Sequence, residues 1–149
     1  NTDLMFAGKH TYNILSTDAD AILPHLFEDF DPEFSKNVSK GDIIIAGENF
    51  GCGSSREHPS VGLANAGVRA IIAKSVNRIF FRSSINQGLV LIVHKEAVNA
   101  YRKGDAVLPD LEKGEIRIGS EIFTFEPLPE KLKQIIDNKG QINFIKKDK

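Results

Sequence analysis

The fold is decided by residues 41–93, which read GDIIIAGENFGCGSSREHPSVGLANAGVRAIIAKSVNRIFFRSSINQGLVLIV. Three short, largely apolar runs lie in this stretch, at 43–46, 68–73 and 89–93. Such runs are typical of strands buried on both faces of a sheet. Two segments with helical spacing lie between them, at 56–66 and 75–88, the second capped by Ser75. Strands that alternate with helices indicate parallel βαβ units, so we predict an α/β fold.

The flanking sequence predicts different elements. Residues 1–16 are expected to form strand and loop, and Thr17 is expected to cap a short helix that Pro24 breaks. Further predictions are a loop at 28–41, a short helix at 96–102, meander strands at 106–111, 115–118 and 122–125, a closing amphipathic helix at 129–138, and a solvated basic tail. We expect residues 1–149 to form one domain.

Composition excludes several classes of protein. The net charge of −1, from 19 basic and 20 acidic residues, argues against a nucleic-acid binder. Cys52 is the only cysteine, which excludes an internal disulfide and is too few thiolates for an iron–sulfur cluster held by this chain. No apolar run approaches the roughly 20 residues of a membrane span. We therefore expect a cytoplasmic protein that binds no metal by itself and contacts neither nucleic acid nor membrane.

The chemistry is expected in the loop at 47–58, which reads GENFGCGSSREH between a buried strand and a helix. In open α/β sheets, ligands bind at the carboxyl ends of the strands. Gly51 and Gly53 allow successive amides to turn toward an anion, and Arg56 can grip a carboxylate through two parallel hydrogen bonds. The residues alone therefore predict a site for a small carboxylate or phosphate.

The loop has other interpretations. A serine before a helix is often only a cap, and the spacing matches neither a Walker A motif, nor the dinucleotide-binding fingerprint, nor a nucleophile elbow. A cysteine hydrolase using Cys52 and His58 is the weakest alternative, because a free cysteine usually behaves as a small buried apolar residue. His10, His25 and His94 show no metal-ligand spacing and are expected on surfaces or loops.

The motif G-x-N-F-G-C-G-S-S-R-E-H at 47–58 resembles that of the aconitase and isopropylmalate isomerase family, in its small subunits and in the mobile domain of aconitase. The strings AGVRAIIAKS at 66–75 and RIFFRSSINQGL at 78–89 extend the resemblance, which is strong over 41–93 and fair over 1–145. It implies a swivelling β/β/α domain that closes over a 4Fe-4S cluster held by a large subunit. It also implies a strand ahead of Asn1, so an N-terminal piece is expected to be missing.

The resemblance implies roles for individual residues. Ser54 matches the serine that removes a proton from the carbon next to a carboxylate. Ser55 and Arg56, with the Gly53 backbone, match groups that bind the substrate. The cluster iron would act as a Lewis acid on the departing hydroxyl. Glu57 and His58 are expected to orient the loop.

A second segment, Lys9, His10, Thr11 and Tyr12, matches the stretch that discriminates substrates in this family. It departs from the usual sequence of the isopropylmalate enzymes, which leaves the substrate open. The resemblance implies dehydration and rehydration of 2- and 3-isopropylmalate in leucine biosynthesis, in a heterodimer or heterotetramer with the large subunit. Homoaconitate, dimethylmalate or methylmalate-type substrates are alternatives, and so is an anion-binding module without catalysis.

Overall fold

The centre of the molecule is a three-stranded parallel sheet of β1 (Ile43–Ala46), β2 (Ala70–Ala73) and β3 (Val90–Val93), in that order. A computed structural model describes residues 1–147 of the chain. The strands pair in simple register, with Ile44 opposite Ile71 and Ile71 opposite Leu91. The connections run through helices α4 (His58–Asn65) and α5 (Arg78–Asn86). The predicted parallel βαβ units are confirmed.

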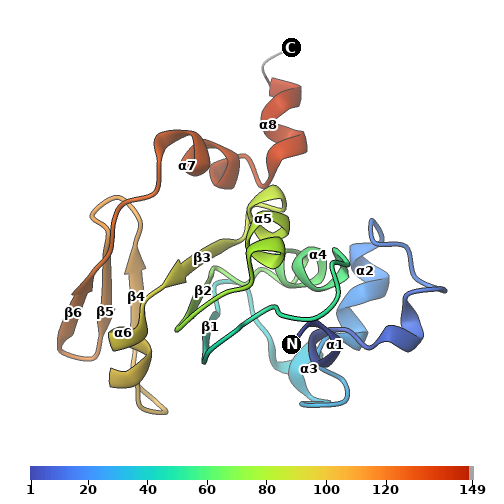
Figure 1. Ribbon diagram of the computed structural model, residues 1–149, viewed down its shortest axis with the longest axis horizontal. Coiled ribbons are helices and arrows are strands. Elements are labelled where there is room, and N and C mark those ends of the chain that lie inside the picture. The colour runs from blue at the N-terminus through green and yellow to red at the C-terminus, as the bar shows by residue number, and fades with distance from the viewer. Residues whose placement is uncertain (148–149) are drawn as a thin grey trace.

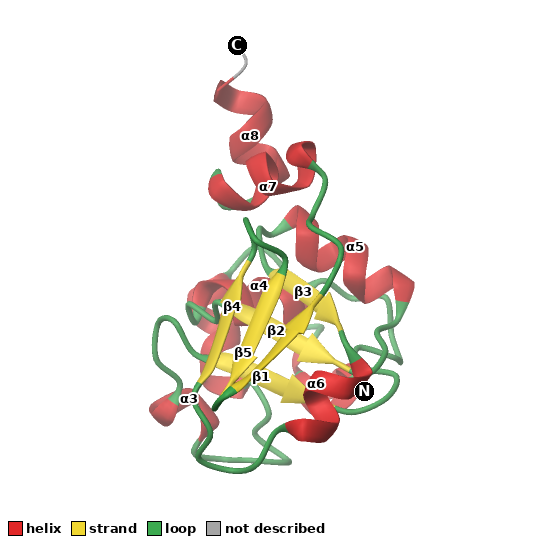
Figure 2. Ribbon diagram, turned by 90° about the vertical axis from the view of Figure 1, so that its left-hand side faces the viewer, coloured by secondary structure: helices red, strands yellow, loops and turns green. Residues whose placement is uncertain are grey.

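A second sheet is an antiparallel meander of β4 (Val107–Asp110), β5 (Glu115–Ile118) and β6 (Glu121–Thr124). Its strands lie within a residue or so of the predicted ones. Gly114 and Gly119 have φ of +66° and +55°, which suits the tight turns that start β5 and follow it. The two sheets lie against each other, as Figures 1 and 2 show from two sides.

The molecule has three layers, namely the meander, the parallel sheet and the helices. The alternating direction of side chains along the parallel strands explains this arrangement. Ile72 and Ile92 point toward the meander and pack with Ile116. Their neighbours Ile71 and Leu91 point to the opposite face and pack in the cluster that holds the helices. Because successive side chains of a strand point to opposite faces, one apolar run serves two cores. The result is the expected β/β/α layering, with helices α2 (Ala19–Ile22), α4 and α5 on the side away from the meander (Figure 1).

The remaining elements are short. They are α1 (Thr2–Met5), the 3₁₀ turns η1 (Gly8–His10) and η2 (Leu23–His25), α3 (Phe34–Asn37), α6 (Lys95–Ala100), α7 (Glu130–Asp137) and α8 (Gln141–Lys147). Helix α8 extends away from the two sheets in both ribbon views (Figures 1 and 2). Within residues 1–147, no helix has both the length and the apolar character needed to span a bilayer.

Several local predictions were wrong. Residues 1–16 form α1 and η1 with only an isolated bridge from Phe6 to Leu26, because the Asn1 side chain caps the first turn by accepting from the Asp3 amide. The 28–41 segment, predicted as a loop, contains α3. The basic tail is solvated as predicted as far as Lys146 and Lys147, which are exposed, but these residues belong to the unpredicted helix α8, and Lys149 lies outside the described residues.

The two predicted caps were also wrong. Asp18, not Thr17, caps α2, and Asn77, not Ser75, caps α5 through a 2.9 Å bond from the Ile79 amide. Each true cap lies one or two residues nearer its helix, where its side-chain oxygen reaches the first free amides.

Candidate functional site

The loop at 47–57 leaves the carboxyl end of β1 and is fixed along one edge by the segment that follows β2. The Asn49 amide donates to Ser75 Oγ at 2.7 Å, and that hydroxyl donates to Glu48 Oε2 at 2.7 Å. Phe50 forms a parallel bridge with Val76. Ser75, expected as a helix cap, therefore anchors the loop.

Gly51 passes against the buried ring of Phe80. Its φ is +75°, and a Cβ at this position would lie 2.2 Å from the ring. Only glycine fits here, since both the backbone conformation and the close approach exclude a side chain.

Thr2 fixes the other edge of the loop. This residue is 2% exposed, and its amide donates to the Cys52 carbonyl at 2.7 Å. Its hydroxyl accepts from the Ser54 amide at 2.8 Å and lies 3.3 Å from the Ser54 carbonyl, to which it donates. Gly53 has φ +119°, and a Cβ there would lie 2.5 Å from Thr2 Oγ1. The position of Ser54 is thus set by a residue far away in sequence.

The Arg56 guanidinium is the centre of the site. Its Nε donates to Ser54 Oγ at 2.9 Å, one terminal nitrogen donates to Thr11 Oγ1 at 3.3 Å, and the other pairs with Asp3 Oδ1 at 2.7 Å. A cation this close to a hydroxyl oxygen stabilises the negative charge of its deprotonated form. Arg56 and Ser54 are both half-buried, so they remain accessible from the surface.

The expected cradle of amides is only partly available to an anion. The Cys52 amide donates to the Asn49 carbonyl at 3.1 Å, and the Ser54 amide donates to Thr2. Both of these amides hold the loop in place and are not free to bind an anion. Gly53 and Ser55 are exposed beside them. An anionic ligand would therefore depend mainly on Arg56.

Ser54 and Arg56 are half-buried, so the candidate site lies at the surface of the chain. A depression lined by β4 and β5 residues and by Arg69 lies elsewhere, away from the loop. Most ligand sites bury the greater part of the ligand surface, so Ser54 and Arg56 alone would form one face of such a site.

The predicted discriminating segment divides into parts with different contacts. Thr11 contacts Arg56 and donates to the Gly8 carbonyl at 2.7 Å. Lys9 and His10 turn instead to Glu28, at 2.8 Å and 2.6 Å. Tyr12 is 95% exposed. Thr11 is therefore the residue of this segment that hydrogen-bonds to the loop at 47–57.

The Glu28 carboxylate accepts hydrogen bonds from three side chains, those of Lys9, His10 and His25. Burial acts most strongly, and it raises the pKa of this carboxyl, but the hydrogen bonds from Lys9, His25 and His10 together outweigh it and lower the pKa to about 2. The Glu28 carboxylate is consequently ionised at neutral pH.

Cys52 and His58 do not form a thiol–imidazole pair. His58 is 6% exposed, its ring stacks on Phe6 with centroids 4.8 Å apart, and its Nε2 donates to the Ile14 carbonyl at 2.9 Å. The other ring nitrogen is buried without a hydrogen-bond partner in the described part of the chain. This geometry removes the main support for the cysteine-hydrolase alternative.

The sequence predicted no individual role for four residues near the site or its discriminating segment: Thr2, Asp3, His25 and Glu28. The partners of Thr2 and Asp3 in the site are 52 and 53 positions away. No spacing rule connects such residues. His25 and Glu28 are three residues apart and both polar, which is a signal too common to single them out.

Comparisons with known proteins agree with this architecture. Residues 14–97 match the aconitase C-terminal domain family. The chain is 43% identical over 148 residues to the 3-isopropylmalate dehydratase small subunit 1 of Archaeoglobus fulgidus, covering 98% of this chain and 89% of that protein. It is 44% identical to the small subunit from Caldanaerobacter subterraneus, covering 98% of this chain and 90% of that protein.

A solved structure extends the agreement to three dimensions. The crystal structure of 3-isopropylmalate dehydratase from Methanocaldococcus jannaschii superposes with a TM-score of 0.85 at 36% identity, covering 99% of this chain and 86% of that one. Identity and coverage at these levels extend far beyond the loop motif. The chain belongs to the 3-isopropylmalate dehydratase small-subunit family, whose fold is the aconitase C-terminal domain.

Proposed function

We propose that this chain is the small subunit of a 3-isopropylmalate dehydratase, a hydro-lyase that dehydrates and rehydrates 2- and 3-isopropylmalate as a step of leucine biosynthesis. The observation that carries the proposal is the 2.9 Å hydrogen bond from Arg56 Nε to Ser54 Oγ, with the Ser54 amide held by Thr2. The relatives that support it are named for this activity and match nearly the whole chain.

In the proposed mechanism, Ser54 is the base. Its oxygen takes the proton from the carbon next to a substrate carboxylate, and Arg56 stabilises the deprotonated serine that does so. A serine is a weak base at its ordinary pKa, so a guanidinium at hydrogen-bond distance is what makes the role feasible. The same arginine, with Ser55 and the Gly53 backbone, would bind the carboxylate. Asp3 is then the group that the substrate carboxylate replaces at Arg56.

The chain is proposed to act only in complex with a large subunit that carries the 4Fe-4S cluster. Its single cysteine, Cys52, is half-buried within the loop, and one thiolate does not hold such a cluster. The half-buried position of Ser54 and Arg56 at the surface supports a second chain as the missing wall. We propose a cytoplasmic complex in which residues 1–149 move as one swivelling domain against that partner.

Turnover after mixing with a cluster-bearing large subunit tests this proposal. Ser54→Ala should lower kcat by about 10²–10⁴-fold, the usual contribution of a positioned base. Ser55→Ala is the matched control, since it removes an exposed hydroxyl one residue away and should act mainly on KM. Full turnover in Ser54→Ala would refute the assignment. Absence of turnover with any partner, together with anion binding by the chain alone, would favour the non-catalytic alternative.

Substrate choice within the family is a separate question. Thr11 contacts Arg56 directly, so the segment Lys9, His10, Thr11 and Tyr12 is proposed to discriminate isopropylmalate from homoaconitate, dimethylmalate and methylmalate-type acids. Exchanging this segment for that of a characterised relative should change the kcat/KM ratios across a panel of these acids. Unchanged ratios would mean that selection is made elsewhere.

A further inference from the structure

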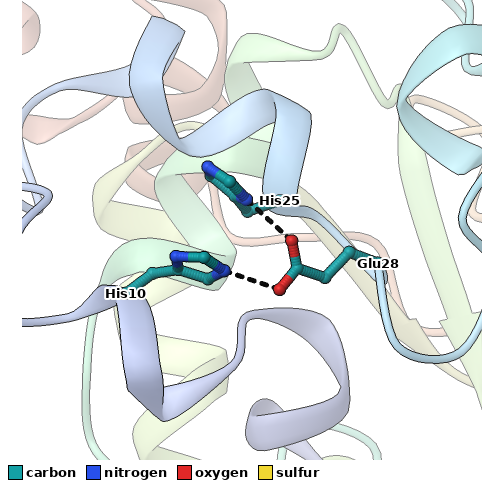
Figure 3. Close-up of side chains that lie close together, drawn as sticks. All are labelled: His10, His25 and Glu28. Atoms are coloured by element: carbon teal, nitrogen blue, oxygen red, sulfur yellow. Dashed lines mark hydrogen bonds and ion pairs between the residues drawn. The ribbon is translucent and has the colours of Figure 1, made fainter.

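A cluster of three side chains capable of binding metal lies beside the discriminating segment. His10 comes from η1, His25 is the last residue of η2, and Glu28 follows three residues later. His10 Nε2 is 2.6 Å from Glu28 Oε1, and His25 Nδ1 is 2.7 Å from Oε2, as the dashed lines in Figure 3 show. One ligand atom from each residue lies within 4.8 Å of the other two.

The two imidazoles are held in place by packing. Their rings stack with centroids 3.9 Å apart and an interplanar angle of 29°. The ring of Phe6, which is 1% exposed, lies 5.8 Å from His10 and 6.5 Å from His25. A buried aromatic side chain next to both imidazoles limits their rotation. The ligand atoms are therefore oriented in advance, which lowers the entropic cost of binding an ion.

The cluster is also accessible. The side chains of His10, His25 and Glu28 are 21%, 32% and 23% exposed. An ion and its remaining water ligands can therefore reach them from solvent without unfolding.

The Glu28 carboxylate supplies the negative charge that a divalent cation needs in this cluster, and the Lys9 ammonium lies 2.8 Å from it. An ion bound to two neutral imidazoles and a carboxylate needs no proton on the ring nitrogens that it contacts. Lys9 competes for Glu28, but its ammonium already lies 3.2 Å from Asp29 and can keep that partner.

We propose that His10, His25 and Glu28 form a binding site for a divalent transition-metal ion of the Zn²⁺ class. Two imidazoles and one carboxylate are a common protein ligand set for Zn²⁺, and they leave a position for water. Two nitrogen ligands disfavour Mg²⁺ and Ca²⁺, which prefer oxygen. The ion would link the segment that carries His10 to the chain that follows η2.

Titration of the chelator-treated full chain with Co²⁺, followed by its visible absorption, and competition with Zn²⁺ test the site. We expect one equivalent to bind. His25→Gln keeps a hydrogen-bond donor for Glu28 but removes the imidazole ligand, so it should weaken binding by at least about tenfold. Lys9→Gln is the matched control, because it removes the competing ammonium and should leave binding as tight or tighter.

The absorption also reports which side chains bind. Glu28→Gln should weaken Co²⁺ binding as His25→Gln does, and circular dichroism should show both variants folded. Equal affinity in wild type, His25→Gln and Glu28→Gln would overturn the proposal, as would the absence of saturable binding or loss of the site in Lys9→Gln. The measurement uses this chain alone, so its result is independent of turnover with a large subunit.

Discussion

Replacing Thr2 with valine keeps the shape of the side chain and removes one hydroxyl. That hydroxyl accepts the Ser54 amide proton at 2.8 Å and donates to the Ser54 carbonyl at 3.3 Å. Valine leaves the Ser54 amide without its acceptor at a site where Thr2 is 2% exposed. An unsatisfied buried donor costs about 1–3 kcal/mol.

The cost of the unsatisfied Ser54 amide should lie in the lower part of that energy range. Ser54 itself is half-buried, so water can partly replace the lost hydrogen bond. We therefore expect Thr2→Val to lower the free energy of unfolding by about 1–2 kcal/mol. For a chain of this length, that corresponds to a fall in Tm of roughly 3–6 °C. The proposed function adds a loss of kcat, of about tenfold or more, since small displacements of a reacting group are costly.

Thermal unfolding followed by circular dichroism measures the first effect, and turnover of the reconstituted complex measures the second. Thr2→Ser is the matched control, because it keeps the hydroxyl and loses only a methyl group. It should stay within about 1 kcal/mol of wild type. The reasoning fails if Thr2→Val melts with wild type, or if Thr2→Ser is destabilised as much, since the methyl group would then be the important feature.

Three further predictions follow from the same geometry. Gly53→Ala should cost at least about 2 kcal/mol, measured by denaturant unfolding, since φ is +119° and the new Cβ would meet Thr2 Oγ1 at 2.5 Å; an unchanged midpoint contradicts this. Gly62→Ala, usually favourable in a helix, should instead destabilise α4 by about 1–2 kcal/mol, because the Cβ would lie 2.6 Å from a core side chain; a raised Tm would show that the core adapts. The hydrogen bond from the Ser75 hydroxyl lowers the pKa of Glu48 in the folded protein. The pair therefore stabilises the fold at pH values above the ordinary pKa of Glu48, and this stabilisation is lost as the pH falls through the lower pKa of the folded state. NMR titration of Ser75→Ala should show the pKa of Glu48 rising, and an unshifted titration would refute the assignment.

The parallel sheet was predictable because its signals are local. A run such as Ile43–Ala46 is apolar on both faces, and that is visible without knowing what packs on it. The predicted strand agrees with β1 residue for residue. The N-terminal segment was not predictable in this way, because α1 is four residues long and depends on a bond from Thr2 to the Cys52 carbonyl. Short helices that depend on tertiary contacts carry little signal of their own.

The same distinction applies to the site. Ser54 and Arg56 belong to one contiguous motif, so the sequence identified them together. Their partners Thr2, Thr11 and Asp3 are brought to them only by the fold, across 45 to 53 positions. A single sequence contains no spacing rule at that range.

The attachment of the loop on two sides has a consequence for how substrate would enter and product leave. With Ser75 bonded along one edge and Thr2 along the other, this loop is held in place at both edges. In the proposed complex we therefore expect exchange with solvent to occur by movement of the whole chain relative to its large partner. Substitutions at that contact, remote from Ser54, would therefore change kcat when product release is rate-limiting, while the proton-transfer step keeps its rate.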